Sequence, residues 1–349
     1  MQSGKRILGL DVLKVFCISF IVLLHTGVLR DCFSINLDPI CRFAVPCFFM
    51  VTGFFYHSSV NNKREVLQIK KVIILIIIAN VVLITLNVFV CLLNRNSVLD
   101  WLLSCVSKGK VLRLLVFNED LISGSFDSNH IWYLNALLYV LGIAYVFRKI
   151  GIFKVLYYLT PFLLIGGFVV ECFSQQLFGT NFSAGGYYCY YRNFLTVGIP
   201  YFCIGNIIWR FNVEKIRKYR FILLVLSIIL LCVSFLEFRV ELNFSLCTNG
   251  EFFIVTPFYS IGIFLFFYSA FYKKKINRLT AFIALIGERY VVWIYLFHFS
   301  IIQLVGYGLR ICKLPYDFSF IVLPVLSLLI SLFVGVAVDV FLIRKKKRT

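Results

Sequence analysis

The chain has 349 residues, of which 61% are hydrophobic and only 15% are charged. Soluble proteins usually hold about 45–50% apolar residues, so this composition excludes a soluble globular protein and predicts an integral membrane protein. The net charge of +19 does not indicate a nucleic-acid-binding protein, because the basic residues form short clusters between apolar runs instead of one continuous face.

Apolar runs of about 18 residues or more recur along the whole chain, which is the pattern of membrane-spanning helices. We therefore predict an all-α polytopic membrane protein with about ten transmembrane helices, formed by a single integral membrane domain over residues 1–349. The expected spans are 7–29, 39–57, 72–93, 131–147, 155–173, 192–209, 221–237, 252–272, 285–306 and 318–343.

Lys and Arg concentrate in alternate connectors, including 58–71 and 210–220, and in the C-terminal tail. Cytoplasmic loops carry such an excess of basic residues, so both termini are expected in the cytoplasm. The longest connection, residues 94–130, then lies outside. Within it, Trp101 to Phe117 is too charged to cross and is expected to lie along the membrane interface as an amphipathic segment.

The first expected span carries three ionisable residues, Asp11, Lys14 and His25. At about 100° per residue, the step from Lys14 to His25 is roughly three turns plus 20°, so both side chains share one face about 16 Å apart. Asp11 lies three residues before Lys14, close enough to pair with it. Ionisable residues inside a membrane usually face a bundle interior or a cavity and indicate a functional site.

His25 is a candidate general base, because an imidazole titrates near neutral pH. Lys14, deeper in the same span, is a candidate for holding an anionic donor such as a phosphate or carboxylate. The alternative is a structural Asp11–Lys14 pair together with a hydrogen-bonded core histidine.

Further polar side chains lie within the expected spans, mostly toward their outer ends, and together predict a site that faces the cell exterior. Each is also consistent with an interfacial anchor, because long cationic side chains reach from a span to the interface. These residues are Arg42, His130, Trp132, Arg192 and His298. The tyrosine-rich run Tyr187 to Tyr191 is consistent either with stacking on a sugar ring or with an aromatic belt.

The twelve cysteines contain no Cys-x-x-Cys pair and no Cys/His cluster at metal-ligand spacing, so no metal site is predicted. Most lie in apolar runs, where cysteine packs as a small hydrophobic side chain. A disulfide remains open among those expected outside, namely Cys32, Cys105, Cys189, Cys247 and Cys312.

An ordered set of motifs resembles acyltransferase family 3, a family of integral membrane proteins, over nearly the whole chain. The motifs are Lys14 and His25 separated by ten residues, Arg42-Phe-Ala-Val-Pro46-Cys-Phe48-Phe-Met-Val-Thr-Gly53-Phe, His130-Ile-Trp132-Tyr133-Leu, Arg192-Asn-Phe with Gly198-Ile-Pro200 and Gly205, and Tyr295-Leu-Phe-His298. The resemblance implies a ten-helix O-acyltransferase in the bacterial cytoplasmic membrane, surrounded by lipid.

The resemblance also implies the substrates. The donor would be cytoplasmic acyl-CoA, most often acetyl-CoA, with no bound cofactor. The acceptor would be a sugar hydroxyl of a surface polysaccharide or of a lipid-linked glycan. His25 would be the catalytic residue, either deprotonating that hydroxyl or briefly carrying the acyl group, and Lys14 would engage the donor.

One region departs from the family pattern. Where the family often has Arg-x-x-Arg at the start of the third span, this chain has Gln68-Ile-Lys70-Lys71. Lys70 and Lys71 are therefore the candidates for meeting the donor phosphates, as point charges without the bidentate fork of arginine. The chain also lacks the fused serine-nucleophile domain of some family members, so the membrane domain or a separate partner would complete the transfer.

Two other functions remain open from the residues alone. A glycan transporter or flippase would be expected to show broken helices at matching positions of two repeats, and no such repeat is evident. A glycan polymerase would suit the long outer connection, with its residues Arg95, Arg113, Glu119 and Asp120. That function leaves Lys14 and His25 unexplained.

Overall fold

The computed structural model describes residues 6–28, 38–173, 176, 187–244, 250–313 and 316–346. This part of the chain is helical and contains no strand, which confirms the predicted all-α fold. Seven segments are long and apolar enough to cross a membrane. They are α1 (Leu8–His25), η2 (Asp38–Cys41) with α2 (Ala44–Asn61), α3 (Glu65–Leu93), α7 (Lys154–Cys172), α10 (Val213–Asn243), α13 (Val291–Ile311) and α14 (Tyr316–Lys346).

Three further helices occupy the remaining expected spans: α6 (Trp132–Lys149), α9 (Ile199–Ile208) and α11 (Thr256–Ala270). A π-helical turn, η5 (Phe194–Gly198), leads directly into α9. Because α9 and α11 are short and α6 ends in Arg148 and Lys149, the crossing of the membrane by all ten segments stays a prediction.

The observed helices are longer than the apolar runs at several ends. Helix α3 begins at Glu65, where the sequence predicted residue 72, and α10 covers Val213–Asn243, where it predicted 221–237. The added residues are mainly Lys, Arg, Glu and Gln, which are strong helix formers. An apolar run therefore marks the lipid-buried part of a helix and not its true ends.

The expected span 285–306 is wrong as a single helix. The structure has an amphipathic helix α12 (Arg278–Arg289), which ends next to Tyr290, and a separate helix α13 that starts at Val291. Helix α12 has 12 residues. It is too short to cross a bilayer, which takes about 20 residues.

The chain divides into two compact units. Unit 1 contains Phe48–Phe211 and Ile228–Tyr259, and unit 2 contains Lys5–Cys47, Asn212–Ser227 and Ser260–Thr349.

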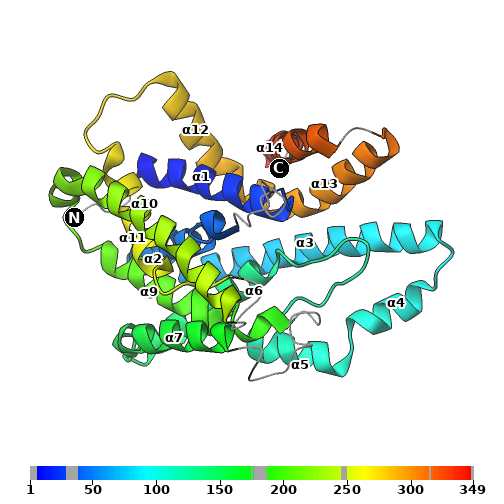
Figure 1. The fold of residues 1–349 in the computed structure, drawn as a ribbon, viewed down its shortest axis with the longest axis horizontal. Helices are drawn as coiled ribbons and strands as arrows, with labels where there is room; N and C mark the ends of the chain where they lie inside the picture. The colour runs from blue at the N-terminus through cyan, green and yellow to red at the C-terminus, as the bar shows by residue number, and fades with distance from the viewer. Residues whose placement is uncertain are drawn as a thin grey trace. The chain divides into compact units, whose positions relative to one another are not determined.

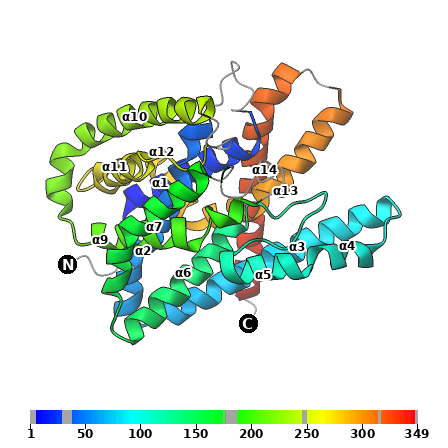
Figure 2. The same ribbon diagram turned by 60° about the horizontal axis from the view of Figure 1, so that its bottom comes forward.

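In unit 1, α6 packs along α3, and α7 packs against α9 (Figures 1 and 2). Helices α2 and α9 come close because both carry glycine at the contact. A Cβ atom on Gly53 would lie 1.9 Å from the Phe202 carbonyl oxygen, and one on Gly205 would lie 2.0 Å from that of Met50. Small residues commonly allow such close helix packing in membranes. Gly53 and Gly205, which belong to the motifs given above, therefore allow α2 and α9 to pack closely.

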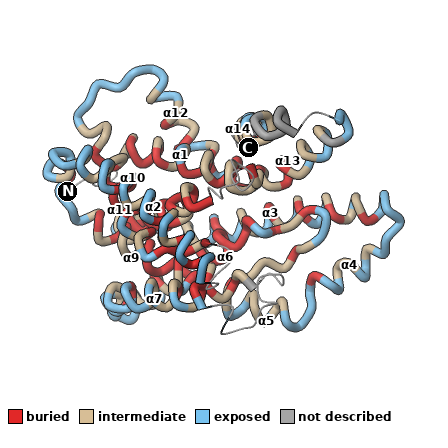
Figure 3. The backbone as a smooth tube through the Cα atoms, in the orientation of Figure 1, coloured by how far each residue is buried: buried red, intermediate tan, exposed pale blue. Residues whose placement is uncertain are grey.

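Two short helices, α4 (Val98–Cys105) and α5 (Lys108–Phe117), follow α3. They cover the stretch that was expected to form one amphipathic segment, and α4 lies beside α3 (Figure 1). Helix α4 buries only Cys105 and α5 buries no residue, whereas α2 and α6 are largely buried (Figure 3). Both are too short to span a bilayer.

In unit 2, α1 packs against α12 and α13, and α13 forms a hairpin with α14 (Figure 2). The ring of Phe43, just before α2, lies 5.5 Å from that of Phe16 and 5.2 Å from that of Phe20. This aromatic cluster fixes the middle of α1, between Lys14 and His25.

Candidate active site

The N-terminal end of α1 carries a network of charges within unit 2. The buried Asp11 carboxylate accepts from Lys14 Nζ at 2.7 Å and from Arg6 Nε at 2.8 Å. Arg6 also reaches α12, where Nη1 lies 2.9 Å from Glu288 Oε2 and Nη2 donates to the Ala284 carbonyl at 2.9 Å. The predicted Asp11–Lys14 pair is present, and it is part of a four-residue network.

Helix α12 meets α1 at Gly287. A Cβ atom on this residue would lie 1.9 Å from the Asp11 carbonyl oxygen, so only glycine allows the two backbones to come this close. The contact brings Glu288 within reach of Arg6 and thereby fixes the position of Asp11 and Lys14. Sequence reasoning missed Arg6 because it precedes the first apolar run.

The other end of α1 carries His25, which is half-buried in the last helical turn. Its ring centroid lies 5.3 Å from that of His298 and 5.1 Å from that of Phe299, both on α13. Two candidates that are far apart in the sequence are therefore neighbours in unit 2. Sequence reasoning named both residues but had no means of pairing them.

His298 is fully buried, and its hydrogen bonds define its orientation. Its Nδ1 lies 2.7 Å from the Tyr295 carbonyl oxygen and 3.2 Å from that of Ile294. Since a carbonyl oxygen only accepts, Nδ1 carries the hydrogen, and in the neutral ring Nε2 has the lone pair. This arrangement fixes the His298 ring against α13 and presents it to His25.

Arg42 lies in the turn between η2 and α2, in unit 2. Its backbone N–H donates to the Pro39 carbonyl at 3.2 Å, and the next residue, Phe43, packs on α1. The predicted position at the outer start of the second span is therefore also a position beside α1, the helix that carries His25.

A second group of candidates comes together in unit 1 around Arg192. Its guanidinium carbon lies 5.3 Å from the centre of the Trp132 ring and 5.0 Å from that of Tyr188, and Nη1 lies 3.3 Å from Glu251 Oε1. A cation between two aromatic rings and a carboxylate is held in one orientation. Arg192 is therefore an ordered side chain, which a simple interfacial anchor does not require.

The partners of Arg192 depend on a loop that follows α10. Glu171, buried near the end of α7, accepts from the backbone N–H groups of Glu251 at 2.8 Å and of Phe252 at 3.1 Å. Glu237 on α10 accepts from the N–H of Ile254 at 2.6 Å. These two carboxylates fix the loop and so position Glu251 against Arg192. The sequence signal was their location, because both are acidic residues within apolar runs.

Asp120 and His130 lie in the connection between α5 and α6, also in unit 1. Burial raises the pKa of Asp120 to about 7, although the Arg192 charge and a hydrogen bond with Ser128 both act to lower it. His130 is almost fully buried just before α6. Asp120 entered the sequence analysis only as part of a charged loop, and its proximity to Arg192 depends on tertiary packing.

Lys70 and Lys71 are exposed on α3 in unit 1, near a network that sequence reasoning missed. The buried Glu65 accepts from Tyr56 Oη at 2.5 Å and from Arg148 Nε at 2.7 Å, and Arg148 Nη2 binds its second carboxylate oxygen. This bidentate pair attaches the start of α3 to the end of α6. The two lysines remain accessible at that end of α3.

The remaining sequence expectations concern tyrosines and cysteines. Tyr188 packs on Arg192, whereas Tyr191 is fully buried, so the tyrosine run serves at least in part as packing. Cys105, Cys189 and Cys312 are free thiols, and Cys32 and Cys247 lie outside the described residues. No group of three metal-ligating side chains occurs in the part of the chain that the structure describes.

Comparison with known proteins places the chain against a protein family. The model of acyltransferase family 3, described as an acyltransferase domain, matches residues 7–343. The match includes both groups of candidates, those around His25 and those around Arg192. No curated protein matches the chain with significance, and no solved structure does.

Proposed function

The chain belongs to acyltransferase family 3, and from this premise we propose that it moves an acyl group from cytoplasmic acyl-CoA to a sugar hydroxyl. The protein is a multi-pass membrane acyltransferase by its family and its apolar helices. Our proposal concerns the substrates and the location. The acyl group is acetyl, the acceptor is a surface polysaccharide or its lipid-linked precursor, and the membrane is the bacterial cytoplasmic membrane.

The observation that supports this function best is the pairing of His25 with His298. His25 is half-buried at the end of a membrane helix, and the buried His298 ring lies 5.3 Å from it. A histidine that is held by packing and still partly accessible suits general base catalysis.

His25 removes the proton from the acceptor hydroxyl, whose oxygen attacks the thioester carbonyl carbon of the donor. The carbon–sulfur bond then breaks, and the CoA sulfur leaves with the proton that His25 held. Alternatively, the lone pair of a His25 ring nitrogen attacks the thioester carbonyl and CoA leaves as the thiolate. The sugar hydroxyl then attacks the acyl group, the carbon–nitrogen bond breaks, and the freed imidazole takes the hydroxyl proton. A positioned general base contributes about 10²–10⁴-fold to such a reaction.

Lys14 and Asp11 serve the donor in this proposal. Asp11 and Glu288 balance the charges of Arg6 and Lys14, so the network as a whole does not attract an anion. A lysine ammonium has three N–H donors, and Asp11 takes one of them. The other two are oriented by that bond and are available to a phosphate of the donor. Lys70 and Lys71 supply exposed positive charge on α3 in unit 1 and are a separate candidate contact for donor phosphates.

The test is the O-acetyl content of surface polysaccharide, measured by proton NMR in cells that produce His25→Ala or Lys14→Ala at matched membrane levels. We expect His25→Ala to lower the acetyl signal by about 100-fold or more while the glycan yield holds. The matched control is His57→Ala, because His57 belongs to neither group: its ring centroid lies 3.6 Å from that of Trp209 in unit 1. Unchanged acetylation together with loss of surface glycan would support export or polymerisation instead.

A further inference from the structure

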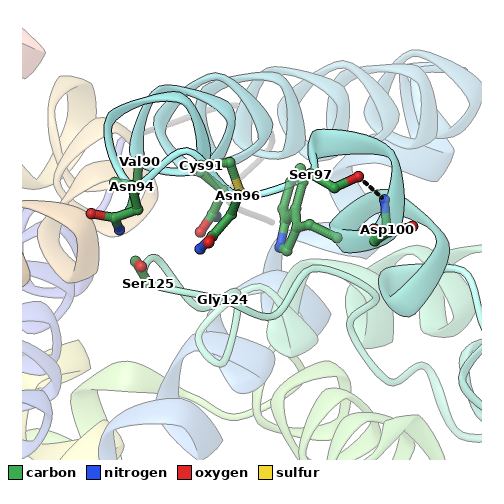
Figure 4. A pocket seen from close by; sticks show the side chains of 10 residues that line it. Val90, Cys91, Asn94, Asn96, Ser97, Asp100, Gly124 and Ser125 are labelled. Carbon is green, nitrogen blue, oxygen red and sulfur yellow. Dashed lines mark hydrogen bonds between the residues drawn. The ribbon is translucent and has the colours of Figure 1, made fainter.

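A pocket of about 360 Å³, with Asn, Ser and Asp side chains among the residues that line it, opens in unit 1 at the C-terminal end of α3 (Figure 4). Its volume falls within the range of about 300–1,000 Å³ that is usual for small-molecule sites. The end of α3, the start of α4 and the turn at Gly124 and Ser125 line it. Figure 4 shows Asn94 and Asn96 on one side and Ser125 facing them from the other.

Specific hydrogen bonds build the pocket. Asn87 donates to the Phe126 carbonyl at 2.8 Å and accepts from the Phe126 N–H at 3.0 Å, which attaches the turn to α3. Trp101 Nε1 donates to the Ser123 carbonyl at 2.8 Å, which attaches the same turn to α4. Gly124 has φ of +156° and approaches Asn87 so closely that a Cβ atom would lie 2.6 Å from Oδ1. The pocket is therefore a formed feature of this connection.

The side chains that line the pocket suit a neutral ligand with several hydroxyl groups. Asn94, Asn96 and Ser97 are exposed polar side chains, and Asp100 adds one carboxylate. Amide groups donate and accept at once, which matches neighbouring hydroxyls of a sugar ring. Trp101 adds an aromatic surface for the apolar face of such a ring. No lysine or arginine is among the ten residues that line the pocket, so its charge does not suit acyl-CoA phosphates.

The pocket also lies at the correct end of α3 for an external acceptor. Helix α3 has 29 residues. At about 1.5 Å per residue it measures roughly 43 Å, more than the ~30 Å hydrocarbon core. Its first turns carry Lys70 and Lys71 and follow Lys63 and Arg64, so the positive-inside rule assigns that end to the cytoplasm. The pocket at the other end then faces the exterior.

We propose that this pocket binds a neutral saccharide unit of the acceptor glycan, an assignment whose role in acyl transfer rests on the function proposed above. Asn94 and Asn96 hold the sugar hydroxyls, and Trp101 supports the ring. The binding itself requires only the described side chains of unit 1.

The test uses the full-length protein in lipid nanodiscs and saturation-transfer-difference NMR with methyl glycosides of glucose, galactose and N-acetylglucosamine, and with methyl glucuronide as an anionic probe. We expect saturable binding of at least one neutral glycoside. The double variant Asn94→Ala/Asn96→Ala should weaken it by roughly ten-fold, the effect of losing two or more hydrogen bonds. The matched control Asn62→Ala removes an exposed asparagine near the other end of α3 and should bind like wild type.

The assignment is overturned by no saturable binding of any neutral glycoside, or by equal binding to wild type and the double variant. Tighter binding of methyl glucuronide than of every neutral glycoside also contradicts it. His25→Ala separates this result from the transfer chemistry, because that variant should lose acyl transfer and keep glycoside binding. If glycosides bind but no variant changes acetylation, the pocket is a saccharide site and the proposed function fails.

Discussion

At the scale of single residues, Asp120 links the candidate group around Arg192 to pH. Burial raises the pKa of its carboxyl to about 7 in the folded protein, whereas an unfolded aspartate titrates near 3.9. Between these values the folded state holds a proton that the unfolded chain releases. The free energy of unfolding should therefore fall as pH rises from about 4 to about 7, by at most ~1.4 kcal/mol per pH unit, and then level off.

Asp120→Asn should remove this pH dependence, because the amide cannot titrate. Thermal unfolding in detergent between pH 4.5 and 8 measures it, and the wild-type midpoint should fall by a few degrees over that range relative to the variant. Asp127→Asn is the control, since Asp127 is a half-buried carboxylate of the same connection. Parallel pH profiles for wild type and Asp120→Asn would contradict the assignment of the raised pKa to this residue.

The residues themselves show what sequence reasoning can and cannot reach. Lys14 with Asp11 was predictable, because residues three apart on a helix meet wherever that helix lies. Arg192 was named as a candidate, but Glu251, 59 residues away, was not. That contact depends on how Glu171 holds the intervening loop, which is a tertiary effect with no local pattern.

At the scale of elements, α12 was missed because membrane spans are found by averaging hydropathy along the sequence. A hydropathy window averages over its length, so the polar end of α12 and the apolar start of α13 merged into one expected span. No proline marks the break at Tyr290. In the structure, Leu279 and Phe282 of α12 are exposed while Ala284 and Gly287 are buried, a pattern that hydropathy does not predict.

The contact between α12 and α1 predicts a strong effect of Gly287→Ala. The added Cβ would lie 1.9 Å from the Asp11 carbonyl oxygen, so the helices must separate. Overpacking of this kind costs about 1–3 kcal/mol. It should also weaken the Arg6–Glu288 pair, so both the thermal midpoint in detergent and the acyl-transfer rate should fall.

Gly306→Ala is the matched control on α13. A Cβ atom at Gly306 meets no atom within 4 Å, so alanine should be tolerated or slightly stabilising there. If Gly287→Ala behaves like Gly306→Ala in both stability and transfer, the close approach of α1 and α12 is not needed for function.

At the scale of the whole molecule, the sequence predicted the helical membrane class well because lipid imposes one simple rule. Every backbone polar group must be satisfied inside the segment, so long apolar runs become helices regardless of their neighbours. The grouping of the candidates into one set with His25 and another with Arg192 was not predictable in this way. It depends on tertiary contacts, such as those between α1 and α13 for His25 and those of Glu171 with the loop after α10 for Arg192, which no local pattern reveals.

The last prediction concerns which side of the membrane each end of α3 faces. If α3 crosses the membrane with its basic start in the cytoplasm, a reporter fused after Asn62 lies inside and one fused after Asn96 lies outside. Alkaline phosphatase should then be active only in the second fusion, and green fluorescent protein should be fluorescent only in the first. A fusion to the complete chain should behave like the first, because an even number of crossings returns the C-terminus to the cytoplasm. The reverse result at Asn96 would place the polar pocket on the side of the CoA donor, where a surface glycan does not reach it.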